Sequence, residues 1–268
     1  MDAITSRQNA GVKRFRALAR TAPTAAGEIL LDGEHLIDEA LAAGVAVDVA
    51  VFAQPHLDRS ATLSELSHRV TATGGRIAVA PEHVFSAMAP VRQPSGAVAI
   101  ARATPVALAT AFQGPKPLVV IVAGVQDPGN VGAIIRSAAA FGATAVVVTE
   151  GSANPFGWKA LRGAMGGTFR ISVVAAASQD EVIASARAGG VPLVATVPRG
   201  GTPLPDARLD DACALVLGGE GAGLPDGVIA AARAQITIPM RGQIESLNVA
   251  IAAAVVLYEA SRQRSEYP

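Results

Sequence analysis

The second half of the chain alternates short, continuously apolar runs with longer stretches of helical or loop character. Each apolar run predicts a strand, and the runs cover residues 118–123, 145–149, 170–174, 192–197, 214–218 and 235–239. Runs that are apolar at every position are typical of parallel strands whose two faces are both covered by helices. We therefore expect an α/β domain over residues 118–268, with ligand-binding loops at the carboxyl ends of its strands.

The first part of the chain, residues 1–103, alternates in the same way but less regularly. Helices are predicted at 7–20, 34–43, 60–72 and 81–89, and strands at 28–31, 47–52, 76–80 and 97–101. This pattern indicates a smaller α/β domain. Residues 104–117 hold three prolines, one glycine and one charge, which favours an interdomain linker or a linker helix.

Composition bounds the function. The 268 residues fit one large or two ordinary domains, and the formal charge is zero, so any nucleic-acid contact must come from a local patch. One basic patch lies near the N-terminus, where a single acid, Asp2, accompanies Arg7, Lys13, Arg14, Arg16 and Arg20. A solvated basic helix face explains this patch as readily as a binding surface does.

Several absences narrow the chemistry. The single cysteine, Cys213, excludes a disulfide framework, and no signal peptide or bilayer-spanning run is present, so we expect a cytoplasmic protein. All histidines precede residue 104, which disfavours a metal site or a Ser-His-Asp triad in the α/β domain. The absence of GxGxxG weakens a nucleotide-dependent alternative.

The loops after residues 123, 218 and 239 carry the candidate polar residues. Asn130 is placed to cap a helix, and Arg136 falls opposite that helix's apolar face, where a solvated arginine is the ordinary alternative. Glu220 lies among glycines that let a backbone approach a ligand. Ser246 reads as the N-cap of a helix that is apolar nearly all round, with Asn248 as the exception. This set orients substrates without a covalent intermediate, which suits methyl transfer from a sulfonium, because the leaving group is already activated.

Three segments in order carry a family resemblance. NVGAIIRSAAAFG (130–142), LVLGGEGAGLP (215–225) and IPMRGQIESLNVAIAAAVVLYE (238–259) resemble the three motifs of SpoU/TrmH RNA 2′-O-ribose methyltransferases, within the SPOUT superfamily. Residues 151–171 look like the stretch that links the motifs, and residues 4–18 and 30–41 look like the opening segments of the family's substrate-binding domain.

The resemblance implies a trefoil-knotted parallel-sheet domain over 118–268, an L30-like RNA substrate-binding domain over 1–103, and a homodimer without metal. It implies S-adenosylmethionine as cofactor and RNA as substrate, with ribosomal RNA preferred over transfer RNA. The implied catalytic residues are Asn130, Arg136, Glu220, Ser246 and Asn248. The implied cofactor-binding residues are Thr196, Val197, Leu217, Gly218, Gly219, Ile238, Met240, Ser246 and Leu247, and the implied RNA contacts are Arg7, Lys13, Arg14 and Arg136.

The chain departs from the family pattern at Ala164, where many members carry serine, and at RQPSG (92–96), which differs from the more usual proline-glutamine-glycine turn. The second departure leaves the RNA-contacting surface open. A non-catalytic RNA-binding protein of the same fold is the remaining alternative, against which Arg136, Glu220 and Asn248 speak.

Overall fold

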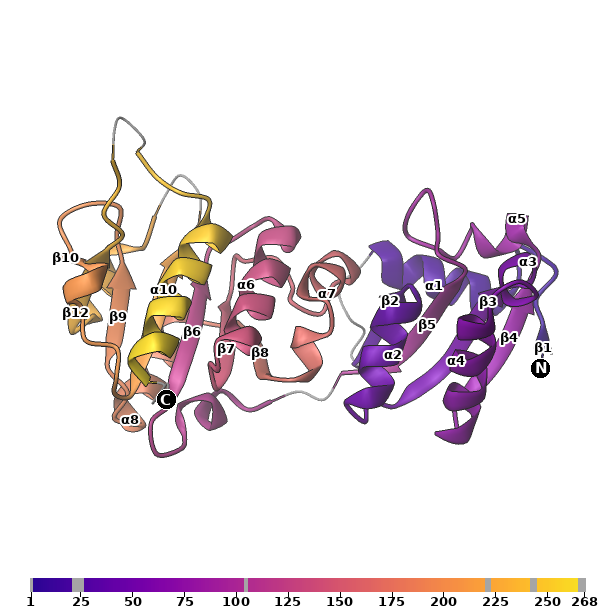
Figure 1. The fold of residues 1–268 in the computed structure, drawn as a ribbon, viewed down its shortest axis with the longest axis horizontal. Helices are drawn as coiled ribbons and strands as arrows, with labels where there is room; N and C mark the ends of the chain where they lie inside the picture. Colours follow the sequence, from indigo (N-terminus) through magenta and orange to yellow (C-terminus); the bar gives the residue numbers. More distant parts are fainter. Residues whose placement is uncertain (1, 21–26, 104–105, 220–222, 242–244, 265–268) are drawn as a thin grey trace. The chain divides into compact units, whose positions relative to one another are not determined.

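The computed structural model describes residues 2–20, 27–103, 106–219, 223–241 and 245–264. The chain forms two compact units (Figure 1). Unit 1 comprises residues 1–104 and 156–169, and unit 2 comprises residues 105–155 and 170–268. The division expected from the sequence differs in one segment, because residues 156–169 pack with unit 1.

Unit 1 is built on a mixed sheet. Its described strands stand in the order β1-β4-β3-β5-β2, with β1, β4 and β3 parallel and β5 antiparallel to both of its neighbours. The strands are β1 (Asp2–Ala3), β2 (Glu28–Asp32), β3 (Val47–Ala53), β4 (Arg76–Ala80) and β5 (Ala97–Arg102).

Helices cover both faces of this sheet, because successive strand residues point to opposite sides. Ile29 and Leu31 pack toward α2 (Glu34–Ala42) and α4 (Ala61–Ala72), whereas Leu30 packs toward α1 (Ala10–Arg20) and α5 (Glu82–Phe85). A further short helix, α3 (Gln54–Leu57), follows β3. The predicted small α/β domain is confirmed, and its likeness to L30 stays a prediction.

Residues 156–169 contribute α7 (Trp158–Ala164) and the 3-10 helix η2 (Gly167–Phe169) to unit 1. Leu161 is fully buried in the core that α2 and α4 cover. The Trp158 indole N–H donates to the carbonyl of Ala19 at 3.0 Å. No local sequence pattern predicts this packing, because it depends on a surface built by residues more than fifty positions earlier.

The buried carboxylate of Asp32 ties the same segment to β2. Arg162 donates to Asp32 Oδ2 at 3.0 Å, while Oδ1 has no partner among the described residues. Burial raises the pKa of Asp32, and Arg162 opposes that shift.

The described residues of unit 2 form a seven-stranded sheet that is parallel throughout, in the order β10-β12-β9-β11-β6-β7-β8. The predicted α/β class and parallel sheet are confirmed. The strands are β6 (Leu118–Ala123), β7 (Ala145–Thr149), β8 (Ser172–Ala177), β9 (Leu193–Thr196), β10 (Thr202–Pro203), β11 (Cys213–Gly218) and β12 (Ala234–Thr237).

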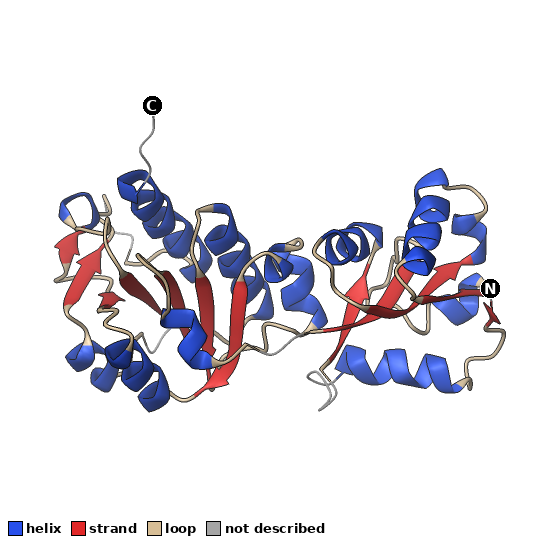
Figure 2. Ribbon diagram, turned by 90° about the horizontal axis from the view of Figure 1, so that it is seen from below, coloured by secondary structure: helices blue, strands red, loops and turns tan. Residues whose placement is uncertain are grey.

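Helices cover both faces of the unit 2 sheet (Figures 1 and 2). On one face α6 (Pro128–Ala140) packs beside α10 (Val249–Arg264). On the other lie α8 (Gln179–Ala188), α9 (Asp226–Ala231) and the 3-10 helix η1 (Leu108–Phe112), while η3 (Leu204–Asp206) follows β10. The predicted linker therefore contains a helix whose Phe112 is buried in the core of unit 2. None of the described helices is long and apolar enough to cross a bilayer.

Candidate active site

A cavity of about 810 Å³ opens in unit 2 where the carboxyl ends of β9 and β11 meet the segments that follow β12. This is the edge at which parallel sheets bind ligands. Every residue that the sequence predicted to hold the cofactor lines this cavity: Thr196, Val197, Leu217, Gly218, Gly219, Ile238, Met240, Ser246 and Leu247.

Hydrogen bonds fix the strand ends around the cavity. The Thr196 hydroxyl donates to the carbonyl of Val216 at 2.8 Å, and the Val197 N–H donates to the carbonyl of Ile236 at 2.9 Å. The Thr196 side chain therefore links β9 to β11 at the wall of the cavity.

Glycine is required at the end of β11 by close backbone approach. A Cβ on Gly218 would lie 2.7 Å from the carbonyl carbon of Gly223, and one on Gly219 would clash with the carbonyl oxygen of Gly124. Gly219 and Gly223 form an isolated antiparallel bridge. The main chains of Gly219 and Gly223 are thus paired beside the cavity that both residues line.

Two asparagines from motifs that are distant in the sequence, Asn130 and Asn248, contact each other near the cavity. The Asn248 Nδ2–H donates to Asn130 Oδ1 at 3.1 Å. Asn248 Oδ1 accepts from the N–H groups of Ala250 at 2.9 Å and Ile251 at 3.3 Å. Because those bonds occupy the oxygen, the amide of Asn248 must present its NH₂ to Asn130.

The capping assignments made from the sequence are wrong for both helices. Helix α6 is capped by Asp127, whose carboxylate accepts from the Asn130 N–H at 2.9 Å, so the Asn130 side chain is not the cap. Helix α10 is capped by Asn248 and not by Ser246, which is exposed and lines the cavity. Asp and Asn are as good at the N-cap as Ser, so local preference could not decide between neighbours.

The other predicted catalytic residues lie apart from this pair. Arg136 is exposed on α6, opposite the apolar face of that helix as predicted, and it does not line the cavity. Glu220 lies outside the described residues. Among the described residues, no cluster of three or more His, Cys, Asp or Glu side chains could hold a metal ion.

Helix α10 supplies cavity residues that the sequence analysis missed, namely Val249, Ala252 and Val256. The sequence signal for these positions was the apolarity of the helix on nearly all sides. The structure divides the helix between the cavity, the sheet core and a solvent-exposed face that carries Ile251 and Tyr258.

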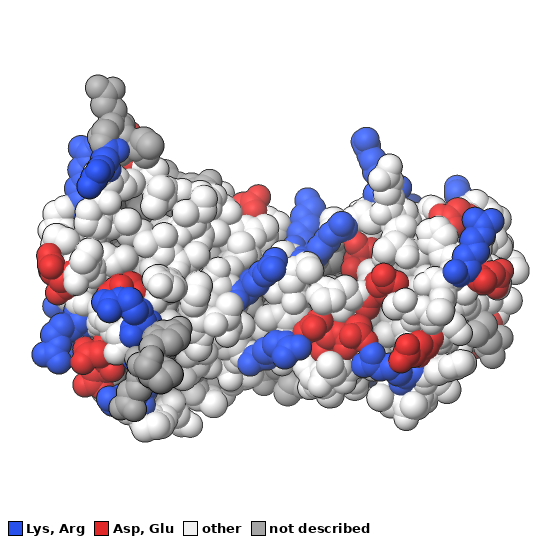
Figure 3. Space-filling model, in the orientation of Figure 1, with Lys and Arg blue, Asp and Glu red and all other residues white. Residues whose placement is uncertain are grey.

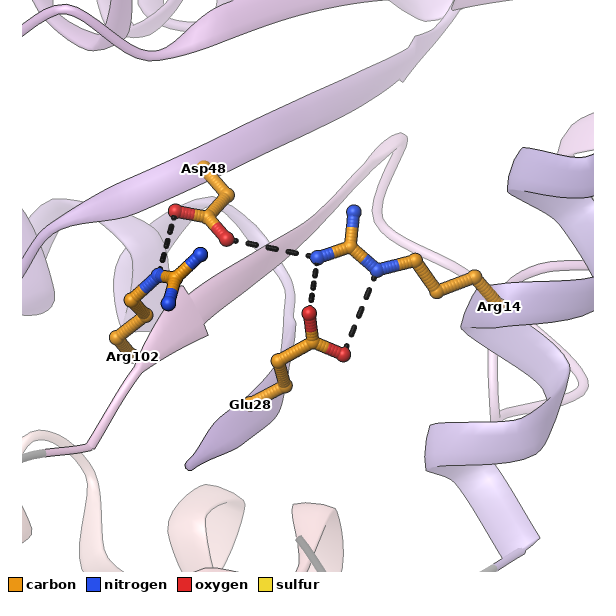
Figure 4. A network of polar contacts seen from close by, with 4 residues as sticks. All are labelled: Arg14, Glu28, Asp48 and Arg102. Carbon is orange, nitrogen blue, oxygen red and sulfur yellow. Dashed lines mark hydrogen bonds and ion pairs between the residues drawn. The ribbon is translucent and has the colours of Figure 1, made fainter. Parts of the chain in front are cut away.

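The predicted RNA-contacting residues of unit 1 differ in their surroundings. Arg7 and Lys13 are exposed, and Arg7 donates to the carbonyl of His83 at 2.9 Å. Arg14 instead donates to both oxygens of the Glu28 carboxylate and lies 3.4 Å from Asp48 (Figure 4).

A second guanidinium completes this network. Arg102 donates to the other oxygen of Asp48 at 3.1 Å (Figure 4). The hydrogen bond to Glu28 raises the pKa of Arg14, and the bond to Asp48 raises that of Arg102. The charge of Arg14 is thus compensated within unit 1, and its contact with RNA stays a prediction.

Comparison with known proteins gives this geometry a context. Residues 117–258 match the sequence model of the SpoU rRNA methylase family. The chain is 34% identical over 260 residues to the 23S rRNA (guanosine(2553)-2′-O)-methyltransferase RlmP of Bacillus subtilis, covering 96% of this chain and 98% of that protein.

Two solved structures are similar over nearly the whole chain. An rRNA methyltransferase from Sinorhizobium meliloti with bound AdoMet has a TM-score of 0.85 at 29% identity and covers 97% of both chains. The SpoU methyltransferase AviRb from Streptomyces viridochromogenes, in complex with AdoMet, has a TM-score of 0.83 at 31% identity and covers 96% of this chain and 99% of that one. This chain therefore belongs to the SpoU rRNA methylase family, enzymes that transfer a methyl group from S-adenosylmethionine to an RNA ribose 2′-hydroxyl.

Proposed function

We propose that this enzyme methylates the ribose 2′-hydroxyl of a guanosine in 23S ribosomal RNA. RlmP, matched over nearly the full length of both chains, is named for this activity. The RlmB proteins of Xanthomonas campestris and a Burkholderia species, at 40% identity over 157 residues and 30% over 240 residues, are also named as 23S rRNA guanosine 2′-O-methyltransferases. One observation of the structure carries the proposal: the cavity gathers the predicted cofactor residues next to the Asn130–Asn248 pair.

The cavity suits S-adenosylmethionine in size and chemistry. Its volume lies within the range of about 300–1,000 Å³ that is common for cofactor sites. Leu217, Ile238 and Leu247 offer apolar walls for an adenine ring, and main-chain groups of Gly218 and Gly219 offer hydrogen-bonding partners for its edge. The exposed Arg199 and Glu245 offer charges that complement an amino-acid group. When bound, S-adenosylmethionine supplies a methyl group activated by a sulfonium.

The chain's own residues align the nucleophile. Asn130 and Asn248 hold each other at the first turns of α6 and α10 and fix the edge of the site that the ribose approaches. Arg136 binds the phosphate next to the target ribose, since a guanidinium matches phosphate oxygens in geometry and charge. An oxygen of the phosphate that Arg136 holds would take the hydroxyl proton as the 2′-oxygen receives the methyl group. A guanidinium already carries its proton and holds it too tightly to act as the base.

RNA binding is assigned to unit 1. Arg7 and Lys13 are exposed and close in sequence, and neither makes an ion pair with the described residues, so both can reach phosphates. Ribosomal RNA as the substrate implies work in the cytoplasm.

A homodimer is the expected assembly. Ile251, Val255 and Tyr258 on α10 are 56%, 38% and 57% exposed, and together with Ala133 of α6 they line a shallow apolar depression. The space-filling view shows few charged side chains over α6 and α10 (Figure 3). An apolar patch of this kind marks an interaction surface.

The trefoil knot stays a prediction from the resemblance.

Mapping of ribose methylation tests the proposal. Ribosomal and transfer RNA from cells with and without the gene would be compared position by position, and the purified enzyme would be supplied with radiolabelled S-adenosylmethionine and unmodified 23S RNA. The expected result is one 23S guanosine whose 2′-O-methyl group depends on the gene. Labelling of transfer RNA alone, or of a nucleotide other than guanosine, would overturn it.

A further inference from the structure

A second, polar cavity of about 360 Å³ adjoins the cofactor cavity in unit 2. Gly219 and Gly223 line both, so the bridge between these glycines separates two neighbouring spaces. The second cavity lies at the carboxyl ends of β6 and β7, beside the first turns of α6 and α8. Its polar side chains are Gln126, Asp127, Asn130, Glu150 and Gln179.

Two of these side chains have tasks already. The Asp127 carboxylate caps α6, and Asn130 Oδ1 accepts from Asn248. The Glu150 carboxylate makes no ion pair or hydrogen bond with the described residues, whereas its main chain is held on both sides. Its N–H donates to the carbonyl of Ala177 at 2.9 Å, and its own carbonyl accepts from the Thr149 hydroxyl at 3.2 Å. The structure thus anchors the backbone and leaves the carboxylate available.

A β-bulge shapes the strand ends at this cavity. The pairing of β7 with β8 shifts register after Val147, and Ala176 on β8 adopts a φ of 55°, which is strained for a residue with a Cβ. Bulges of this kind redirect side chains and are frequent next to active sites. Here β8 ends just after the bulge, at Ala177, whose carbonyl accepts from the Glu150 N–H. Gln179 follows two residues later and lines the cavity.

We propose that this cavity receives the base of the target nucleotide and that Glu150 selects guanine. The inference rests on the proposed guanosine substrate. Guanine presents two adjacent donors, N1–H and the N2 amino group, and a carboxylate offers two acceptor oxygens in the same plane. Adenine presents an acceptor at N1, which a carboxylate repels. A base in this cavity places its ribose toward the glycine bridge, with the cofactor cavity on the other side.

The test compares guanosine with inosine at the target position of a short 23S RNA fragment. Inosine keeps N1–H and lacks the N2 amino group. Inosine lacks one of the two donors, and the loss of one hydrogen bond to a charged group lowers a rate or affinity by about tenfold or more, so we expect the wild-type kcat/KM to be about tenfold lower for inosine. For Glu150→Gln, we expect kcat/KM for guanosine to fall by about 10- to 100-fold, as for loss of a bidentate base contact, and the preference over inosine to shrink to less than about threefold.

Asp180→Asn is the matched control. Asp180 is the exposed carboxylate next to Gln179, and it does not line the cavity. It should retain wild-type rates and preference. Both variants should bind S-adenosylhomocysteine and melt as the wild type does, because neither carboxylate lines the cofactor cavity or the core.

The outcomes separate the two proposals. Wild-type methylation of a guanosine together with an unchanged guanosine-over-inosine preference in Glu150→Gln would overturn the role of Glu150 and leave the proposed function standing. Methylation of a different nucleotide by the wild type would overturn the proposed function itself. A lower rate in Glu150→Gln with the wild-type preference intact would identify Glu150 as structural and refute base selection.

Discussion

Asn248 has two structural roles, a helix cap and an amide donor, and substitutions can separate them. Its oxygen caps α10, and its amide donates to Asn130. Asn248→Ala removes both, whereas Asn248→Asp keeps an N-cap acceptor and loses the donor. Asp is as good an N-cap as Asn, and its charge is favourable at a helix N-terminus.

The magnitudes follow from these contacts. Loss of an N-cap costs about 1 kcal/mol, which corresponds to a fall in Tm of about 2–4 °C for a chain of this size. We expect that fall for Asn248→Ala and no fall beyond about 1 °C for Asn248→Asp. Both variants should lose about 100-fold in the methyl-transfer rate, because displacement of a positioned group by about 1 Å has this effect.

Three measurements check the reasoning: thermal unfolding, calorimetry with S-adenosylhomocysteine, and single-turnover methylation. Cofactor affinity should change by less than about threefold, since Asn248 does not line the cofactor cavity. Wild-type turnover in Asn248→Asp would show that the amide pair does not position the reaction. Equal losses of stability in both variants would show that the cap contributes nothing.

Further substitutions test the remaining assignments. Arg136→Ala should slow methyl transfer by about 100-fold or more with folding intact, because Arg136 is exposed, and wild-type turnover would reduce it to a solvated side chain. Ile251→Asp should yield monomers in light scattering, while an unchanged mass would place the subunit contact elsewhere. Leu161→Ala should lower the free energy of unfolding by about 2–5 kcal/mol in denaturant titration, because Leu161 is fully buried in unit 1, and a loss under about 1 kcal/mol would contradict that burial. Hydrogen bonds from Arg262 and Gln263 lower the pKa of Glu259 from 4.5 to about 2. The ionised carboxylate therefore stabilises the fold above pH 4.5, and this stabilisation is lost as the pH falls toward 2. Glu259→Gln should therefore lose less Tm than the wild type over that range, and parallel losses would refute the assignment.

The strands of unit 2 illustrate what periodicity can establish. Residues 118–123 and 145–149 are strands with the predicted bounds, because strands buried on both faces are apolar at every position and end where polarity returns. The cavity of unit 2 also lies where the sequence predicted a ligand site, because it is formed by segments that follow strand ends, and its role as the cofactor site stays a prediction.

Contacts between segments that are distant in the sequence could not be predicted from this alternation. Arg14 looked like part of a basic surface, but Glu28 on β2 and Asp48 on β3, the strands on either side of β5, engage it. The helix of residues 249–264 looked uniformly apolar, and only its packing shows which positions meet the sheet, the cavity and solvent.

The sequence by itself determined the α/β class, the order of strands and helices, and the loops that carry the polar residues, because these depend on local alternation of apolar and polar positions. The tertiary structure decided that residues 156–169 belong to unit 1, that Asp127 and Asn248 are the caps, and that Asn130 and Asn248 meet. The physical reason is that a cap or a paired amide has several competitors of equal local preference, and the energy that selects among them comes from groups far away in the chain.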